Sequence, residues 1–316
     1  MTKPVKMGGT ASGPSGHLME ERPPSRSRLP PWIRIRYSGR GTQDAVNQLL
    51  KAGGLHTVCQ GARCPNQHEC FSRGVATFMI LGDICTRDCR FCAVHSGHPA
   101  AVDPDEPRRL AEAVARLKLR HVVVTSVTRD DLADGGAHHF AATIQAIRHQ
   151  SPEATVEVLT PDFKGVEHDI DVVLEAGPDV FNHNLETVRS LQKTIRPAAS
   201  YECSLAVLAY AAQRGGRTDV KSGLMVGLGE TDEEVYEAMG DLRRAGVALL
   251  TIGQYLAPSV AHAPVARYVT PAQFEEYARR GQALGFRNVA SAPMVRSSYM
   301  AEHQFHGGAR TGGAGG

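Results

Sequence analysis

The sequence predicts an α/β protein built as a partial (βα)6 parallel barrel with an extension at each end. From about residue 75 onward, short apolar runs of strand length alternate with amphipathic runs of helical length. Such alternation is typical of a parallel sheet whose connecting helices pack outside it. Six of these units can be counted, which is too few for a closed eight-stranded barrel. We therefore expect an open barrel.

Six segments have the length and composition of buried strands. They are rich in Val, Ile and Leu and are bounded by Gly, Asn, Asp or charged residues. In chain order they are 75–81, 121–127, 155–160, 179–183, 221–226 and 249–255.

The segments between these strands carry apolar residues at helical spacing. Leu110, Val114 and Leu117, for example, share one face of a predicted helix. Thr231 is a predicted N-cap, with Glu234 in the capping-box position. The predicted helices are 106–118, 137–150, 169–175, one from Glu186, one from Tyr201, and 231–245.

Four regions are expected along the chain. Residues 1–30 are rich in Gly, Pro, Ser and Arg and have the composition of a disordered tail. Residues 31–74 form an N-terminal extension and 75–286 the barrel. Residues 287–316 form a C-terminal segment with a Gly-rich mobile end.

Charge and hydropathy exclude several classes of partner. The net charge of +2 gives no reason to expect nucleic acid or an anionic membrane as a partner. No apolar run reaches the roughly 18 residues needed to span a bilayer, and no secretory signal is visible. We therefore expect a cytoplasmic protein whose cysteines are reduced.

Six of the seven cysteines fall between residues 59 and 92, in two triplets of different spacing. The triplets are Cys59, Cys64 and Cys70 (C-x4-C-x5-C), and Cys85, Cys89 and Cys92 (C-x3-C-x2-C). Three thiolates bind three irons of a four-iron cube and leave one iron open. Structural zinc usually takes four ligands, and three thiols cannot pair as disulfides. The spacing thus favours two [4Fe-4S] clusters over zinc, each short of one ligand.

Polar side chains follow the predicted strands. The second triplet follows the first strand, and polar residues follow four later strands. These are Thr125, Ser126, Arg129, Asp130, Asp131, Asp162, Lys164, Asn182, His183, Asn184, Glu186 and Gln254. Because ligands gather at the carboxyl ends of parallel strands, this placement predicts a shared cleft. The alternative is that these residues are polar only because loops usually are, and that they form no shared cleft.

The loop Cys85-Thr-Arg-Asp-Cys89-Arg-Phe-Cys92 resembles the radical S-adenosylmethionine (SAM) enzymes. In that superfamily the loop follows the first strand of a partial (βα)6 barrel. The resemblance implies that the open iron binds the amino and carboxylate groups of SAM, and that an electron from the cluster releases a 5′-deoxyadenosyl radical. The SAM contacts expected are Phe91, Thr125, Ser126, Asn182, Glu186, Arg196 and Met225.

The first triplet, together with Arg296-Ser297-Ser298-Tyr299, narrows the resemblance to the lipoyl synthase family. The resemblance implies that Ser297 completes an auxiliary cluster held by the first triplet. A serine alkoxide is a harder and more labile iron ligand than a thiolate, which suits a cluster that gives up its sulfur. The remaining cysteine, Cys203, lies in a predicted helical run, where a buried structural role is expected.

The reaction implied by this resemblance is the insertion of two sulfur atoms, at carbons six and eight of an octanoyl chain on a carrier lysine. No side-chain base could remove a proton from such unactivated carbons, so no catalytic residue is expected beyond the clusters and SAM. Three kinds of partner are implied. They are octanoylated carrier domains (the acyltransferase of a 2-oxoacid dehydrogenase, or the glycine cleavage H protein), a ferredoxin or flavodoxin-type reductant, and iron–sulfur carrier proteins.

Two rival hypotheses remain. One is another sulfur-inserting radical SAM enzyme, similar to biotin synthase or to a methylthiotransferase, which the first triplet and Arg296-Ser297-Ser298-Tyr299 disfavour. The other is a zinc-binding module that contacts nucleic acid. The near-neutral charge and the regular alternation of predicted strands and helices disfavour it.

Overall fold

The computed structural model describes residues 29–34, 40–72 and 76–306. Residues 32–316 form one compact unit, and residues 1–31 are grouped apart from it. Nearly all of the predicted tail at 1–30, and the Gly-rich end at 307–316, therefore lie outside the described residues.

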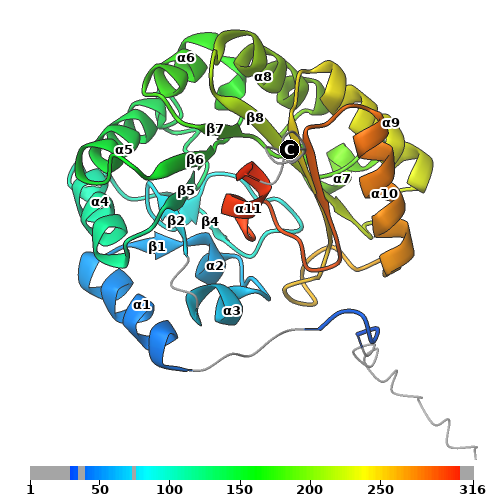
Figure 1. The fold of residues 1–316 in the computed structure, drawn as a ribbon, viewed down its shortest axis with the longest axis horizontal. Helices are drawn as coiled ribbons and strands as arrows, with labels where there is room; N and C mark the ends of the chain where they lie inside the picture. Colours follow the sequence, from blue (N-terminus) through cyan, green and yellow to red (C-terminus); the bar gives the residue numbers. More distant parts are fainter. Residues whose placement is uncertain (1–28, 35–39, 73–75, 307–316) are drawn as a thin grey trace, which may run out of the picture. The chain divides into compact units, whose positions relative to one another are not determined.

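An eight-stranded sheet curves around the centre of the main unit (Figure 1). Every neighbouring pair is parallel except β1 and β2, which are antiparallel. In spatial order the strands are β1 (His56–Thr57), β2 (Thr77–Ile80), β5 (His121–Ser126), β6 (Thr155–Leu159), β7 (Val180–Asn182), β8 (Asp219–Val226), β9 (Leu249–Gln254) and β10 (Asn288–Ser291). Among the described strands β2 and β10 do not pair, so the barrel stays open.

The predicted partial parallel barrel is confirmed, and its six predicted strands correspond to β2 and β5 to β9. The sequence analysis missed β1 and β10. β10 has only one large apolar residue, Val289, and extends the sheet past the expected barrel boundary at 286. β1 has only two residues, too few to show alternation.

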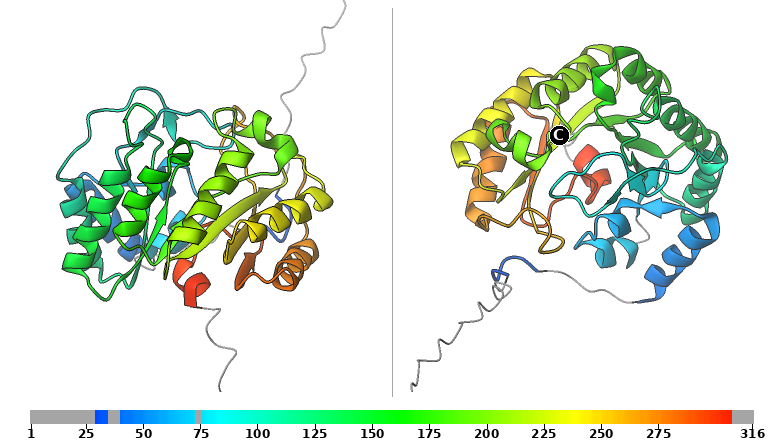
Figure 2. Two further views of the ribbon diagram at one scale, coloured as in Figure 1. Left: turned by 90° about the horizontal axis from the view of Figure 1, so that it is seen from above. Right: turned by 180° about the vertical axis from the view of Figure 1, so that it is seen from behind.

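Helices line the outer face of the sheet (Figure 2). They are α4 (Glu106–Leu117), α5 (Ala137–Gln150), α6 (Glu167–Glu175), α8 (Tyr201–Arg214), α9 (Asp232–Arg244) and α10 (Pro271–Ala283). The predicted capping box of α9 is present, with Thr231 and Glu234 each bonded to the other's backbone N–H. No helix in the described residues is both long and apolar enough to cross a membrane.

The helix predicted from Glu186 is wrong. Glu186 has a φ of 71° and its backbone pairs with Leu224 of β8 instead of starting a helix. Only a 3-10 turn, η2 (Arg189–Leu191), and a short helix, α7 (Gln192–Ile195), follow. A left-handed backbone at a non-glycine residue is uncommon, and such residues concentrate at functional sites.

The remaining elements lie before, between and after the strands and helices of the barrel, and some of them carry the two cysteine triplets. Before β2 lie α1 (Arg40–Gly53), α2 (Val58–Gly61) and α3 (Gln67–Ser72), and after it lie β3 (Ile84–Cys85) and β4 (His95–Ser96). The loop after β6 contains the 3-10 turn η1 (Phe163–Gly165). The last element among the described residues is α11 (Ala301–His306), which Figure 1 shows within the arc of strands.

A buried ion pair ties together the middle of the sheet. Lys221 on β8 donates to both carboxylate oxygens of Glu157 on β6, at 2.8 and 3.0 Å, and both side chains are fully buried. Asn182 on β7 donates to the same carboxylate at 3.0 Å. Burial tends to raise the pKa of Glu157, but the neighbouring Lys221 and His121 outweigh it and hold the pKa below its ordinary value.

Replacement of Lys221 by Met should destabilise the fold by about 3–5 kcal/mol, because it leaves a buried carboxylate without its counter-ion. The pKa of Glu157 should then lie above its unfolded value, so the native state keeps a proton that the unfolded state has released. Stability of Lys221→Met should consequently fall as pH rises from about 5 to 8. Urea unfolding at several pH values measures this.

The double variant Lys221→Met/Glu157→Leu is the control. It removes both charges and should recover most of the lost stability, since an apolar pair can replace a buried ion pair at little cost. A double variant as unstable as Lys221→Met at pH 8 would contradict this account of the pair.

Candidate functional site

The second triplet lies in a loop between two short strands, β3 and β4, which pair in parallel. Cys85 ends β3, and its carbonyl accepts a hydrogen bond from the N–H of Gly97 at 2.9 Å. Its sulfur lies 3.3 Å from the backbone nitrogen of Thr128 and 3.4 Å from that of Arg87. Both N–H groups point at the sulfur, so the backbone fixes the position of this side chain.

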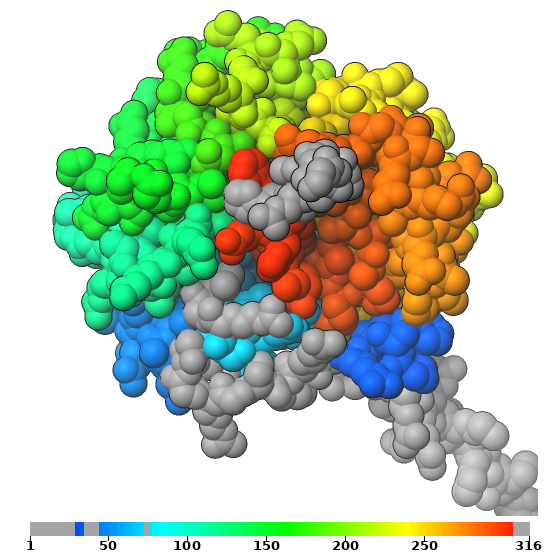
Figure 3. Space-filling view, viewed as in Figure 1, coloured from blue at the N-terminus to red at the C-terminus, as the bar shows by residue number. Residues whose placement is uncertain are grey.

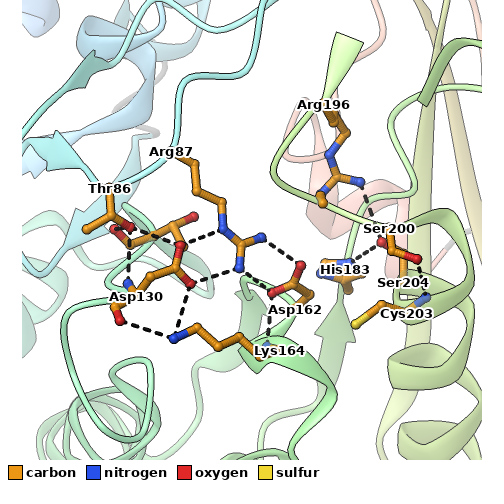
Figure 4. A network of polar contacts seen from close by, with 12 residues as sticks. Thr86, Arg87, Asp130, Asp162, Lys164, His183, Arg196, Ser200, Cys203 and Ser204 are labelled. Atoms are coloured by element: carbon orange, nitrogen blue, oxygen red, sulfur yellow. Dashed lines mark hydrogen bonds and ion pairs between the residues drawn. The ribbon is translucent and has the colours of Figure 1, made fainter. Parts of the chain in front are cut away.

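Arg87 anchors this loop to the loops that follow β5 and β6 (Figure 4). Its guanidinium is almost fully buried and forms paired hydrogen bonds to Asp130 (2.7 and 2.9 Å) and to Asp162 (2.6 and 2.8 Å). Hydrogen bonds from Arg87 hold the pKa of Asp130 below its usual range. Burial tends to raise the pKa of Asp162, but Arg87 outweighs it. Both carboxylates are therefore charged, and the predicted cleft brings these residues together.

The other side of the loop is held by backbone contacts. The N–H of Arg90 donates to Ile195 O at 3.0 Å, and Arg90 O accepts from the N–H of Ala263 at 2.8 Å. His262 Nε2 lies 3.1 Å from Cys92 O. Because a carbonyl only accepts, Nε2 carries the proton and Nδ1 accepts from the Ser259 hydroxyl at 2.8 Å. The loop after β9 therefore closes over the triplet.

The three thiols lie close enough to influence one another electrostatically. Burial, together with the charges of Cys89 and Cys85, raises the pKa of Cys92 to about 12. Thiols with raised pKa values lose their protons when a cation binds them, as in a metal cluster. Three thiols that lie near one another can hold three irons of a four-iron cube.

The predicted SAM contacts fall into two groups. Ser126 Oγ, Asn182 Oδ1 and Arg196 Nε are buried polar atoms that have no hydrogen-bond partner among the described residues. Unpartnered buried polar atoms are costly unless a ligand or water satisfies them, so Ser126 and Arg196 fit a bound polar molecule. The amide nitrogen of Asn182, however, is committed to Glu157 in the buried ion cluster.

The other predicted contacts are already engaged within the fold. Thr125 Oγ1 donates to Leu159 O at 2.9 Å. Phe91 and Met225 pack against a small apolar cluster of Ile195, Leu228 and Tyr255 beside the second triplet. An apolar surface of this kind fits a nucleotide base, which agrees with the expectation that Phe91 contacts SAM.

A buried histidine, His183, ties the segment after β7 to neighbouring elements by hydrogen bonds (Figure 4). His183 Nδ1 donates to Thr160 O at 2.9 Å, which leaves Nε2 to accept from the Ser204 hydroxyl at 3.0 Å. Burial and the nearby Arg196 lower the pKa of His183 to about 4, so the imidazole is neutral. Burial raises the pKa of Glu186 in the same segment, and Arg196 opposes that shift.

The first triplet is carried by α2, the turn after it, and α3. Cys59 is buried, and burial together with Cys64 raises its pKa to about 11. Asn66, between Cys64 and Cys70, donates to Met294 O at 2.7 Å. The C-terminal segment is thereby hydrogen-bonded to the turn that carries the first triplet.

Two further observations concern the predicted fourth ligand and the residue before it. Burial lowers the pKa of Arg296, and the charge of Cys64 opposes that shift. Ser297 Oγ accepts a hydrogen bond from Asn184 Nδ2 at 2.7 Å. Cys203 instead lies on α8, where its sulfur would be 3.4 Å from a Cβ at Gly165. Among the described residues, its electrostatic neighbours are Asp162, Arg87 and Arg196.

Some of these residues were missed as site residues by the sequence analysis. Asn66, Arg87 and His262 act through contacts with residues far away in the sequence, which no local pattern reveals. The sequence analysis listed Asn184 only among the polar residues that follow the strands, although its amide contacts both Ser297 and Glu186. The one available signal was position, because Asn66 and Arg87 lie between cysteines of a triplet.

Solved structures of other proteins share this fold. A methylornithine synthase matches with a TM-score of 0.51 at 14% identity, covering 79% of this chain and 74% of that chain. A Streptococcus suis protein bound to S-adenosylmethionine matches with a TM-score of 0.53 at 10% identity, covering 72% of this chain and 54% of that chain. At these identities the likeness concerns the fold alone. Residues 79–242 also match the radical SAM superfamily.

Curated relatives are far closer in sequence. Lipoyl synthase of Methylococcus capsulatus is 56% identical over 278 residues, which is 88% of this chain and 86% of the relative. Lipoyl synthase of Thermus thermophilus is 54% identical over 291 residues, or 91% and 90% of the two chains. With two incomplete cysteine triplets, a partial parallel barrel and this identity over nearly its whole length, the chain belongs to the lipoyl synthase family of radical SAM enzymes.

Proposed function

We propose that this chain inserts two sulfur atoms into a protein-bound octanoyl chain and that its two triplets divide the work. Cys85, Cys89 and Cys92 hold the [4Fe-4S] cluster that binds SAM, while Cys59, Cys64 and Cys70 hold the auxiliary cluster with Ser297 as fourth ligand. When bound, these groups supply radical chemistry able to break an unactivated C–H bond, and sulfide for insertion.

The observation that carries this proposal is the position of the C-terminal segment. Asn66, in the turn of the first triplet, donates to Met294 O, and Cys64 acts electrostatically on Arg296, the residue before Ser297; both observations support Ser297 as the ligand that the first triplet lacks. A Cβ at Gly253 of β9 would lie 2.1 Å from Val295 O, so the segment presses against the strand itself. Figure 3 shows residues of this C-terminal part, in red and orange, at the centre of the face in view.

The protein's own residues have positioning tasks in this reaction. Arg87 and the two carboxylates fix the loop of the second triplet, and the loop around His262 covers it. Ser126, Glu186 and Arg196 provide polar groups for SAM, and Phe91 provides an apolar surface. Covering the site keeps water from a reactive intermediate, which is the protein's general role in such chemistry.

The partners we propose follow from the substrate. The acyl chain arrives on a lysine of a carrier domain, either the acyltransferase component of a 2-oxoacid dehydrogenase or the glycine cleavage H protein. A ferredoxin or flavodoxin supplies electrons, and iron–sulfur carrier proteins supply clusters.

Incubation of the reconstituted protein with SAM, a reductant and an octanoyl-lysine peptide, without oxygen, tests the proposed sulfur insertion. Mass spectrometry of the peptide is the measurement. A peptide that gains no sulfur would refute the proposed insertion.

The two triplets should bind iron independently. The reconstituted chain should hold about eight irons, and a Cys59→Ala/Cys64→Ala/Cys70→Ala variant about four. That variant should still convert SAM to 5′-deoxyadenosine, because the second triplet is intact. The matching Cys85→Ala/Cys89→Ala/Cys92→Ala variant should also hold about four irons but form no 5′-deoxyadenosine. Equal loss of 5′-deoxyadenosine in both variants would contradict the division.

Removal of the serine ligand should separate hydrogen abstraction from sulfur insertion. Ser297→Ala should retain 5′-deoxyadenosine formation within about twofold and lower sulfur insertion at least about a hundredfold, as expected for loss of a group needed in one step only. The neighbouring Ser298→Ala is the matched control and should insert sulfur normally. Mass spectrometry of the peptide measures both; normal insertion by Ser297→Ala would exclude the serine as an essential ligand.

Replacement of Arg87 should lower the free energy of unfolding more than replacement of an exposed arginine does. Arg87→Gln leaves Asp162 buried without its counter-ion, so the free energy of unfolding should fall by about 3 kcal/mol and iron at the second triplet should be lost first. Arg108 forms an exposed pair with Glu112, and Arg108→Gln should cost less than about 1 kcal/mol. Urea unfolding and iron analysis compare the two. Similar effects in both variants would disprove the anchoring role.

A further inference from the structure

The side-chain amide of Asn184 contacts one residue near the second triplet and one residue in the segment near the first. Its two N–H groups have two acceptors: Ser297 Oγ at 2.7 Å and Glu186 Oε1 at 3.1 Å. Its backbone carbonyl accepts from Arg196 at 3.3 Å. Glu186 and Arg196 act electrostatically on Cys89 of the second triplet, whereas Ser297 belongs to the segment beside the first.

The neighbours of Asn184 fix which way its amide points. Glu186 Oε1 accepts from the amide, so the nitrogen of Asn184 must face it, and the same nitrogen then faces Ser297. The amide oxygen points toward β8, where a Cβ at Gly223 would lie only 2.8 Å from it. That oxygen is buried and has no hydrogen-bond partner among the described residues. A flip of the amide would set oxygen against carboxylate and is therefore disfavoured.

We propose that Asn184 is the positioning residue for the serine ligand of the auxiliary cluster. The inference rests on the proposed function, in which Ser297 Oγ binds iron. As an iron ligand, Ser297 Oγ would give its hydroxyl proton to solvent, and the resulting alkoxide would still have lone pairs to accept from Asn184. A donated hydrogen bond stabilises the anion and fixes its direction, as outer partners do for other metal ligands.

Iron release tests this role without any measurement of sulfur insertion. The full chain with Cys85→Ala, Cys89→Ala and Cys92→Ala is the background, so that only the auxiliary cluster is present. After anaerobic reconstitution, the rate at which a ferrous chelator removes iron is measured. Asn184→Leu, which lacks both donors, should speed release about tenfold. Asn184→Ala, which only removes atoms, is a second variant should the leucine prevent folding.

The control is another side chain that holds the same segment. Gln304 donates to Tyr299 O at 2.6 Å and does not bond Ser297. Gln304→Leu should change iron release by less than about twofold, since the ligand keeps its partner. Far-ultraviolet circular dichroism checks that each variant is folded, and Mössbauer spectra should show an altered iron site in Asn184→Leu but not in Gln304→Leu.

A double-mutant cycle with Ser297→Ala decides whether Asn184 acts through the serine. Ser297→Ala alone should speed iron release, and Asn184→Leu should add nothing in that background. If Asn184→Leu leaves release unchanged, or gives its full effect without Ser297, the inference is overturned while the serine ligand stands. If Ser297→Ala itself leaves release unchanged, both the serine ligand and the inference fall.

Discussion

The auxiliary site depends on one constraint, the space left by two strand positions without side chains. Val295 O approaches β9 where a Cβ at Gly253 would be 2.1 Å away, and Asn184 Oδ1 approaches β8 where a Cβ at Gly223 would be 2.8 Å away. Real Cβ atoms do not come so near, so any larger residue would displace the segment or the amide. Neither glycine has a positive φ, so space and not backbone freedom is what the site requires.

The rest of the site is organised around the loop that follows β7. His183 is held by Thr160 and Ser204, Asn184 bonds Ser297, and Glu186 pairs with β8 in a left-handed conformation. One short stretch of chain thus meets the expected SAM pocket on one side and the serine on the other. A strained backbone at such a point is typical of functional loops, where the surrounding structure holds an otherwise unfavourable conformation.

Local patterns predicted the features that local physics controls. Apolar runs predicted six of the strands, and the capping box at Thr231 predicted the start of α9. The helix predicted from Glu186 failed because pairing with β8 overrides the local preference. The Asn184–Ser297 contact joins residues 113 positions apart. Neither hydrophobic periodicity nor secondary-structure propensity can predict a contact between residues so far apart in the sequence. Resemblance to a family predicted the serine's role, but its partner required the fold.

The most direct test is a crystal structure of the reconstituted protein, grown without oxygen and with data collected at the iron absorption edge. The account predicts two four-iron clusters. One should be bound by Cys85, Cys89 and Cys92, and the other by Cys59, Cys64 and Cys70 with Ser297 Oγ on its fourth iron at bonding distance. A second cluster whose fourth iron binds another residue, with Ser297 bonded only to Asn184, would contradict it.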